Sequence, residues 1–146
     1  MPHPLHPTLV HFPIALIITA LIFHLLYLLS PKIISAKIAL TQLIMGVIGA
    51  FISAWSGEKA MQDAQPFASS EIEGIVEQHE LWANLTIWSG LILLISLIYI
   101  KLKYKNLRLT NRVMLVGLIM LTIFVIRTAL FGAELVYKYH VFIPLK

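Results

Sequence analysis

Four histidines in this chain occupy positions from which they could bind a metal ion or a haem iron. His3, His6 and His11 lie in the proline-rich run Met-Pro-His-Pro-Leu-His-Pro-Thr-Leu-Val-His-Phe-Pro at the start, and His79 lies far along the chain. Histidine is the side chain best suited to such binding near neutral pH. Five residues of a regular helix turn through about 500°, which leaves the side chains of His6 and His11 about 140° apart. Chelation by that pair from one helix is therefore disfavoured, and a site shared by two helices is favoured.

The composition indicates an integral membrane protein. Apolar residues make up 59% of the chain and charged residues 12%, and the mean hydropathy is +0.87. Crossing a hydrocarbon core of about 30 Å takes roughly 20 apolar residues in a helix. Four stretches meet this requirement, at about residues 9–29, 36–55, 81–100 and 113–136, with an outer loop at 57–80. We expect an all-α fold, a four-transmembrane-helix bundle that forms a single domain over residues 1–146.

The charged residues are divided between the two ends of the expected bundle. Seven basic residues and no acidic ones lie in or beside the two short connections: Lys32, Lys37, Lys101, Lys103, Lys105, Arg108 and Arg112. All seven acidic residues fall on or near the opposite side. By the positive-inside rule the short connections face the cytoplasm. For a multi-pass protein of the bacterial inner membrane, both termini are then periplasmic. The formal charge of +4 reports this topology and does not indicate a nucleic-acid partner.

A haem between the first and third spans is the cofactor that the histidines favour. His11 lies two residues inside the first span and His79 two residues before the third, so both lie at nearly the same depth on the outer side. Two histidines at one level on different helices suit bis-imidazole ligation of a haem. The chain has no cysteine, so a haem would be held without thioether links, as haem b is. His6 is a reserve ligand. The alternative is a transition-metal site, for copper or zinc, formed by His6, His11 and His79 with His3 and outer acidic residues.

Arg127 and His24 also lie inside the expected spans and need polar partners there. Arg127 falls about nine residues from the outer end of the fourth span, and an ionisable residue at such a depth is a functional-site hypothesis by default. We expect it to face the bundle interior, paired with Glu134 or with a haem propionate. His24, towards the inner side of the first span, is expected to make a hydrogen bond in the core.

Weak internal similarity suggests a tandem two-helix repeat. An offset of 75 aligns Leu43-Ile44-Met45 with Leu118-Ile119-Met120 and Gly57 with Gly132, and an offset of 73 aligns His6 with His79. Apolar helices also resemble one another by composition, so both explanations stay open. Small residues in the second span, including the row Gly49, Ser53 and Gly57, predict close packing against another helix.

The pattern of the chain resembles a bacterial family of small four-span membrane proteins catalogued as domain of unknown function 2231. Three segments carry the resemblance: His6-Pro7-x-x-Val10-His11-Phe12-Pro13-Ile14-Ala15-Leu16, then His79-Glu80, and the closing Gly132-Ala133-Glu134-Leu135-Val136-Tyr137. Some members are joined to Rieske or c-type cytochrome domains, so the resemblance implies a redox setting. It supplies no established catalytic residue. Where many members end in a glycine-rich stretch, this chain has Lys138-Tyr139-His140.

Two classes of function follow. The first is a small b-type cytochrome-like protein or redox-complex subunit, with cofactor-binding residues His11, His79, His6 and Arg127 and with a Rieske or c-type cytochrome protein as redox partner. The second is a protein that handles copper or zinc at the periplasmic face. A structural subunit of a membrane complex and a homo-oligomer are further candidates. An enzyme is disfavoured, because the chain has no HExxH motif, phosphate-binding loop or nucleophile motif.

Overall fold

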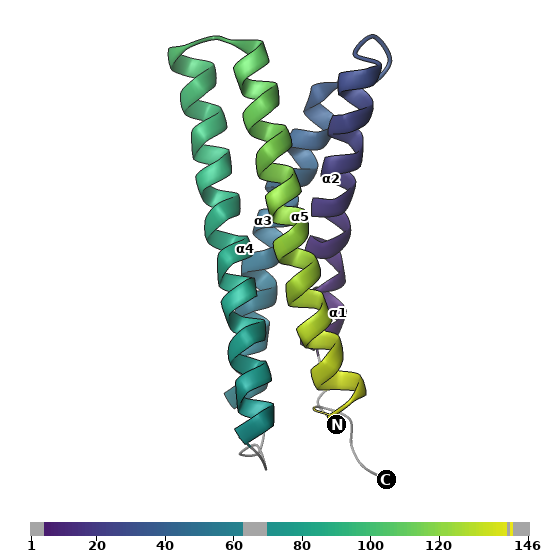
Figure 1. The fold of residues 1–146 in the computed structure, drawn as a ribbon, viewed down its shortest axis with the longest axis vertical. Helices are drawn as coiled ribbons and strands as arrows, with labels where there is room; N and C mark the ends of the chain where they lie inside the picture. The colour runs from purple at the N-terminus through teal and green to yellow at the C-terminus, as the bar shows by residue number, and fades with distance from the viewer. Residues whose placement is uncertain (1–4, 63–69, 140, 142–146) are drawn as a thin grey trace.

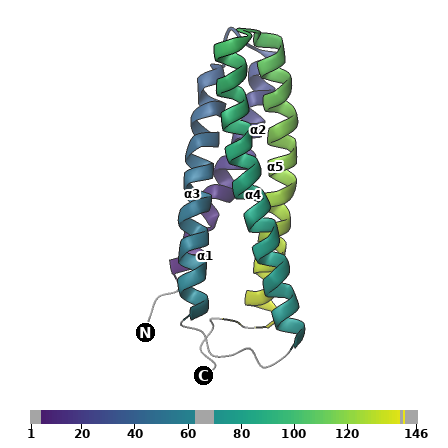
Figure 2. The same ribbon diagram turned by 90° about the vertical axis from the view of Figure 1, so that its left-hand side faces the viewer.

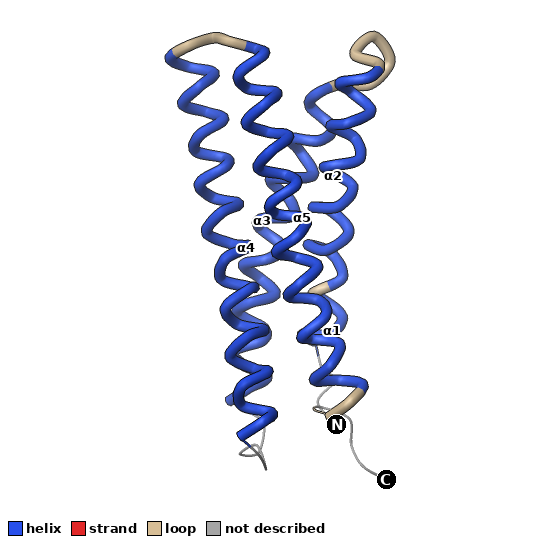
Figure 3. Tube along the Cα trace, in the orientation of Figure 1, coloured by secondary structure: helices blue, strands red, loops and turns tan. Residues whose placement is uncertain are grey.

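The computed structural model describes residues 5–62, 70–139 and 141, and in this part of the chain all regular structure is α-helical (Figures 1 and 3). A short helix α1 is followed by four long helices. Their bounds are α1 Leu5–Leu9, α2 His11–Leu29, α3 Ala36–Gln62, α4 Ser70–Lys103 and α5 Leu107–Tyr137. The all-α prediction is confirmed.

The four long helices form two antiparallel pairs, α2 with α3 and α4 with α5. The connections within the pairs, residues 30–35 and 104–106, lie together at one end of the bundle, at the top of Figure 1. Helix α1 and the last turn of α5 lie at the opposite end, which we call the outer end. In Figure 2, α3 and α4 diverge towards the outer end. In Figure 1 the two pairs diverge towards the end with the short connections, which we call the inner end.

Four helical segments are long and apolar enough to cross a membrane: Leu5–Leu29, Ala36–Ala60, Glu71–Lys103 and Leu107–Tyr137. Large apolar side chains cover their outward faces, for example Trp88, Ile92 and Ile95, each more than 60% exposed. Such a surface needs lipid around it. The helices extend beyond the predicted spans, and α4 begins at Ser70. Much of the predicted loop 57–80 is therefore helical, and residues 63–69 lie outside the described residues.

Small residues bring the helices of each pair close together. A Cβ added at Gly46 would lie 3.0 Å from Ile17 Cγ1, and one added at Gly49 would lie 3.4 Å from Pro13 Cδ. The predicted close packing of the second span is thus confirmed, with the first span as its neighbour. Ile17 itself is fully buried in the core between the pairs.

The first span is broken at Val10, between α1 and α2. Pro13 lacks an N–H group and cannot donate to the carbonyl of Leu9, which removes one helical hydrogen bond at this point. The Ile14 amide reaches the Val10 carbonyl at a long 3.4 Å, whereas the Val10 amide bonds to the His6 carbonyl at 3.1 Å. Consequently α1 is a separate turn that packs against α3 as well as α2. This turn carries His6.

Candidate functional site: two facing histidines

The rings of His6 and His79 meet between the two helix pairs in the outer half of the bundle. Their centroids are 6.1 Å apart and their planes are nearly perpendicular, at 89°. His6 belongs to α1 and His79 to α4, so the site joins the first and third spans. Both residues are half-buried.

His6 is held by the polar groups of α3. Its Nδ1 lies 2.9 Å from the carbonyl oxygen of Ser53 and 3.0 Å from the hydroxyl of Ser56. The Ser56 hydroxyl also donates to the Ser53 carbonyl, at 2.7 Å. The ring lies directly over Gly57, where an added Cβ would be 2.9 Å from His6 Cε1. A Cβ at this position would force the ring to shift.

His79 is held in the same way by α5. Its Nδ1 lies 2.9 Å from the carbonyl oxygen of Thr128, and an added Cβ at Gly132 would be 3.0 Å from His79 Cε1. Each histidine thus lies over a glycine and donates a hydrogen bond to the carbonyl of the residue four positions before that glycine. The two sets of contacts match at the sequence offsets of 73 and 75. The duplication itself stays a prediction.

These contacts determine which nitrogen of each ring is available. The carbonyls of Ser53 and Thr128 can only accept, so each Nδ1 carries the proton and donates it. In the neutral ring Nε2 then keeps its lone pair, and within the described residues neither Nε2 has a hydrogen-bond partner. Metal-binding histidines are commonly oriented by such an Nδ1 hydrogen bond.

The separation of the two rings is compatible with two imidazole ligands of one metal ion. With metal–nitrogen bonds of about 2.0 Å, the centres of two such imidazole rings lie about 6.3 Å apart. The observed 6.1 Å is close to this value. It is also ordinary for two aromatic rings packed edge to face. The hydrogen bonds to Nδ1, rather than the separation, are therefore the informative feature.

The structure pairs His79 with His6 and leaves His11 apart. His11 is exposed beyond the kink and lines a shallow apolar groove with Phe12, Ala15 and Leu16. The preferred ligand on the first span therefore changes from His11 to His6, because the break at Val10 turns His6 towards α3. His3 lies outside the described residues. Among the described residues no group of three or more histidine, aspartate or glutamate side chains is placed to hold a metal ion.

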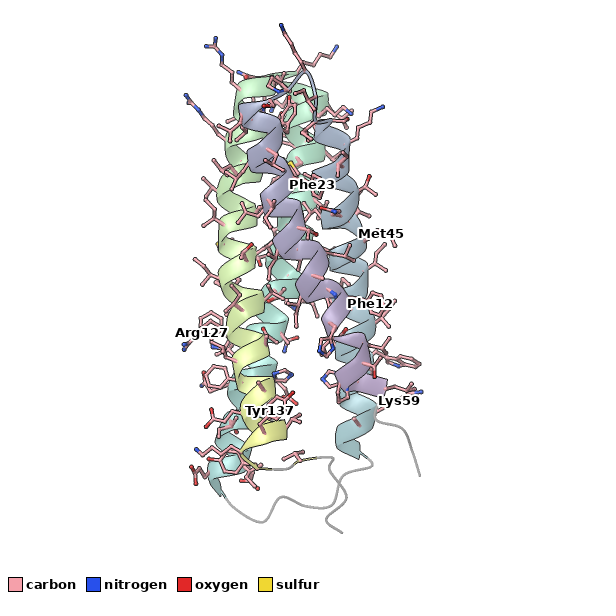
Figure 4. The ribbon with its side chains drawn as sticks, turned by 90° about the vertical axis from the view of Figure 1, so that its right-hand side faces the viewer. Phe12, Phe23, Met45, Lys59, Arg127 and Tyr137 are labelled. Carbon is pink, nitrogen blue, oxygen red and sulfur yellow. The ribbon has the colours of Figure 1, made fainter. Side chains whose placement is uncertain are left out.

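Arg127 does not face the bundle interior, contrary to expectation. Its side chain is exposed and projects from the flank of the bundle in Figure 4. The guanidinium lies 5.3 Å from the ring centres of both Trp82 and Phe131, where cation–π attraction offsets part of the cost of its position. The expected pair with Glu134 is also wrong, since Glu134 binds Lys138 at 3.0 Å. A propionate role for Arg127 stays a prediction.

The end of α5 is fastened to the start of α4. The hydroxyl of Tyr139 donates to the carboxylate of Glu71, and Lys138 Nζ lies 3.6 Å from the same carboxylate. The hydrogen bond to Glu71 raises the pKa of Tyr139. Hydrogen bonds to Tyr139 and Glu134 raise the pKa of Lys138. These contacts hold together the helix pair that carries His79.

His24 has the structural role expected from the sequence. It is fully buried, and its Nε2 lies 3.1 Å from the carbonyl oxygen of Asn111 on α5. The ring of Tyr27 lies 6.0 Å away. His24 therefore links the two helix pairs in the inner half of the bundle, away from the site of His6 and His79.

The fold and its apolar surface define the chain as a membrane-spanning four-helix bundle. A family model described as "predicted membrane protein (DUF2231)" matches residues 2–143. The chain belongs to this family, which confirms the resemblance seen in its sequence. Neither the search of curated proteins nor the search of solved structures gives a match.

Proposed function

We propose that this protein is a small b-type cytochrome-like membrane protein in which His6 and His79 bind a haem iron between the first and third spans. The observation that carries the proposal is the matched orientation of the two rings. Each donates Nδ1–H to a main-chain carbonyl, which leaves Nε2 of both rings as a free base. A pair of this kind on facing helices is what non-covalent haem binding in a bundle requires.

The number of ligands favours haem over a copper or zinc ion. A porphyrin supplies four nitrogen ligands, so two imidazoles complete the coordination of its iron. A zinc ion needs three or four protein ligands. Within the described part of the chain His6 and His79 have no third histidine, aspartate or glutamate placed beside them. Copper or zinc binding is the second candidate, because His3, His6 and His11 lie close together in the sequence at the start of the chain.

The surrounding residues would bind, orient and shield such a group. Ser53, Ser56 and Thr128 fix the two rings, and Gly57 and Gly132 let the rings approach the helices closely. A haem so held supplies one-electron redox chemistry. We propose electron transfer as an independent carrier or as a subunit of a redox complex, with a Rieske or c-type cytochrome protein as partner.

The proposal includes a location. Because the basic residues gather at the end opposite the histidine pair, the site would lie near the periplasmic face of a bacterial inner membrane, with both termini on that side. This side is the one that periplasmic electron carriers can reach.

Purification from haem-replete cells, with elemental analysis and a reduced-minus-oxidised absorption spectrum, tests the proposal. We expect one iron per chain and sharp α and Soret bands. These bands should disappear in His6→Ala and in His79→Ala, and should persist in the control His11→Ala, whose ring is exposed. A colourless protein that contains copper or zinc would move the assignment to metal handling.

A further inference from the structure

A groove on the outside of the α4–α5 pair is a second candidate binding site, independent of the histidine pair. It has a volume of about 380 Å³, and its walls are almost entirely apolar. Its lining includes Ser89, Leu93, Ser96, Val116 and Gly117, with Arg112 at the end nearest the short connections. The volume falls within the range of small-molecule sites, about 300–1,000 Å³.

Small residues form this groove. Ser89 and Ser96 line the groove on α4, and the Leu93 side chain packs directly on Gly117 of α5, where there is no room for a Cβ. At the offsets of 73 and 75, the corresponding residues in the α2–α3 pair are the larger Leu16, Phe23 and Gln42. The comparison suggests which substitution would fill the groove.

The charge at the inner end of the groove has no counterpart in the protein. All seven acidic residues of the chain lie at or near the outer end, whereas Arg112 belongs to the group of seven basic residues around the short connections. In the described part of the chain Arg112 makes no ion pair. Its side chain is exposed and is therefore available to an anionic group from outside the chain. Basic pockets between transmembrane helices are suited to the headgroups of anionic lipids.

We propose that this groove binds one anionic phospholipid of the adjacent leaflet. The phosphate would pair with the guanidinium of Arg112, which can bind phosphate through two N–H groups. One acyl chain would lie along the apolar wall between α4 and α5, beside Ser96 and Gly117. The charged end of the groove would then face the phosphate, and its apolar wall would face the acyl chain.

The test compares lipid binding by the full chain in detergent, using phosphatidylglycerol and phosphatidylcholine of identical acyl chains and native mass spectrometry. We expect a bound phosphatidylglycerol that resists exchange, and Arg112→Gln should weaken its binding about fivefold, as expected for loss of one basic contact. Arg112→Lys should retain most of the binding. Ser96→Phe should abolish binding of both lipids in the groove.

The control is Arg108→Gln. This substitution also removes one positive charge from the first turns of α5, but Arg108 does not line the groove. Circular dichroism checks that each variant is folded. Equal losses in Arg112→Gln and Arg108→Gln would show only diffuse attraction to a basic surface and would overturn the proposal. Undiminished binding in folded Ser96→Phe would also overturn it.

Discussion

Adding a single methyl group beneath each histidine perturbs the site in a way that the structure makes quantitative. In Gly132→Ala the new Cβ would lie 3.0 Å from His79 Cε1, and in Gly57→Ala it would lie 2.9 Å from His6 Cε1. Two carbon atoms at optimal separation lie about 3.5–4.0 Å apart. Each ring must therefore move by roughly half an ångström or more. Overpacking of this kind typically costs about 1–3 kcal/mol.

The same substitution also has a favourable effect, which the control must isolate. Replacing glycine by alanine inside a helix contributes about 1 kcal/mol of helix propensity. Gly74 lies on α4, and a Cβ added there meets no atom within 4 Å. Gly74→Ala should therefore gain up to about 1 kcal/mol, whereas Gly57→Ala and Gly132→Ala should come out roughly unchanged to 2 kcal/mol less stable.

Thermal unfolding in detergent and haem titration measure the two consequences. We expect Gly57→Ala and Gly132→Ala each to lower the midpoint relative to Gly74→Ala and to weaken haem binding, because each moves an imidazole. Gly74→Ala should bind haem as the wild type does. If all three variants behave alike in both assays, the rings are not seated on the two glycines and the site geometry is wrong.

Three further predictions concern residues around the site. Arg127→Met should change the free energy of unfolding by no more than about 1 kcal/mol, the size of an exposed cation–π contact. A double-mutant cycle with Glu134→Gln should give a coupling energy near zero, because Arg127 and Glu134 are not paired. A coupling energy above about 1 kcal/mol would show that the two side chains do interact. A reporter that is active only in the cytoplasm, fused after Lys146, should be inactive, and activity would reverse the proposed topology. Because the pKa of Tyr139 is raised, its hydrogen bond to Glu71 stabilises the end of α5 below the ordinary tyrosine pKa and is lost as the pH rises through the raised pKa. Proteolysis at the end of α5 should therefore increase over that alkaline range, and should increase less in Tyr139→Phe. An equal increase in the wild type and in Tyr139→Phe would contradict the contact.

The sequence was sufficient for the architecture because long apolar stretches have few alternatives in a membrane. Apolar length predicts the four spans, and Ser70 marks the start of α4 well outside the third span. Helix α3 extends to Gln62 although its last five residues include Glu58, Lys59 and Gln62. Hydropathy identifies the apolar residues that can cross the hydrocarbon core. It does not detect helical turns that continue into the water beyond it.

The candidate site was harder to predict, since it depends on the direction of one turn. Counting residues from the membrane surface placed His11 level with His79, but Pro13 and the break at Val10 give His6 the position beside α3. The repeat offset that aligns His6 with His79 was the better signal. The carbonyls of Ser53 and Thr128 belong to the main chain, so no side-chain type in the sequence marks them as hydrogen-bond acceptors. The alignment of Gly57 with Gly132 did indicate two equivalent positions, and the rings lie over these glycines.

Arg127 shows a different limit of sequence reasoning. Its depth in the fourth span predicted an interior position, because an isolated charge is costly in lipid. On the lipid-facing flank of the bundle, cation–π contacts with the rings of Trp82 and Phe131 offset part of the cost of the exposed charge. Phe131 is four residues from Arg127 on the same helix, but the contact with Trp82 joins α5 to α4 and depends on how the helices pair.

The central proposal, that His6 and His79 together bind one haem iron, is tested most directly by electron paramagnetic resonance of the oxidised, purified protein. Two imidazole ligands should give a low-spin ferric signal in the wild type and in His11→Ala. His6→Ala and His79→Ala should each lose that signal, with any retained haem becoming high-spin. A low-spin signal that survives in His6→Ala, or a wild-type protein that binds no haem, would contradict the claim.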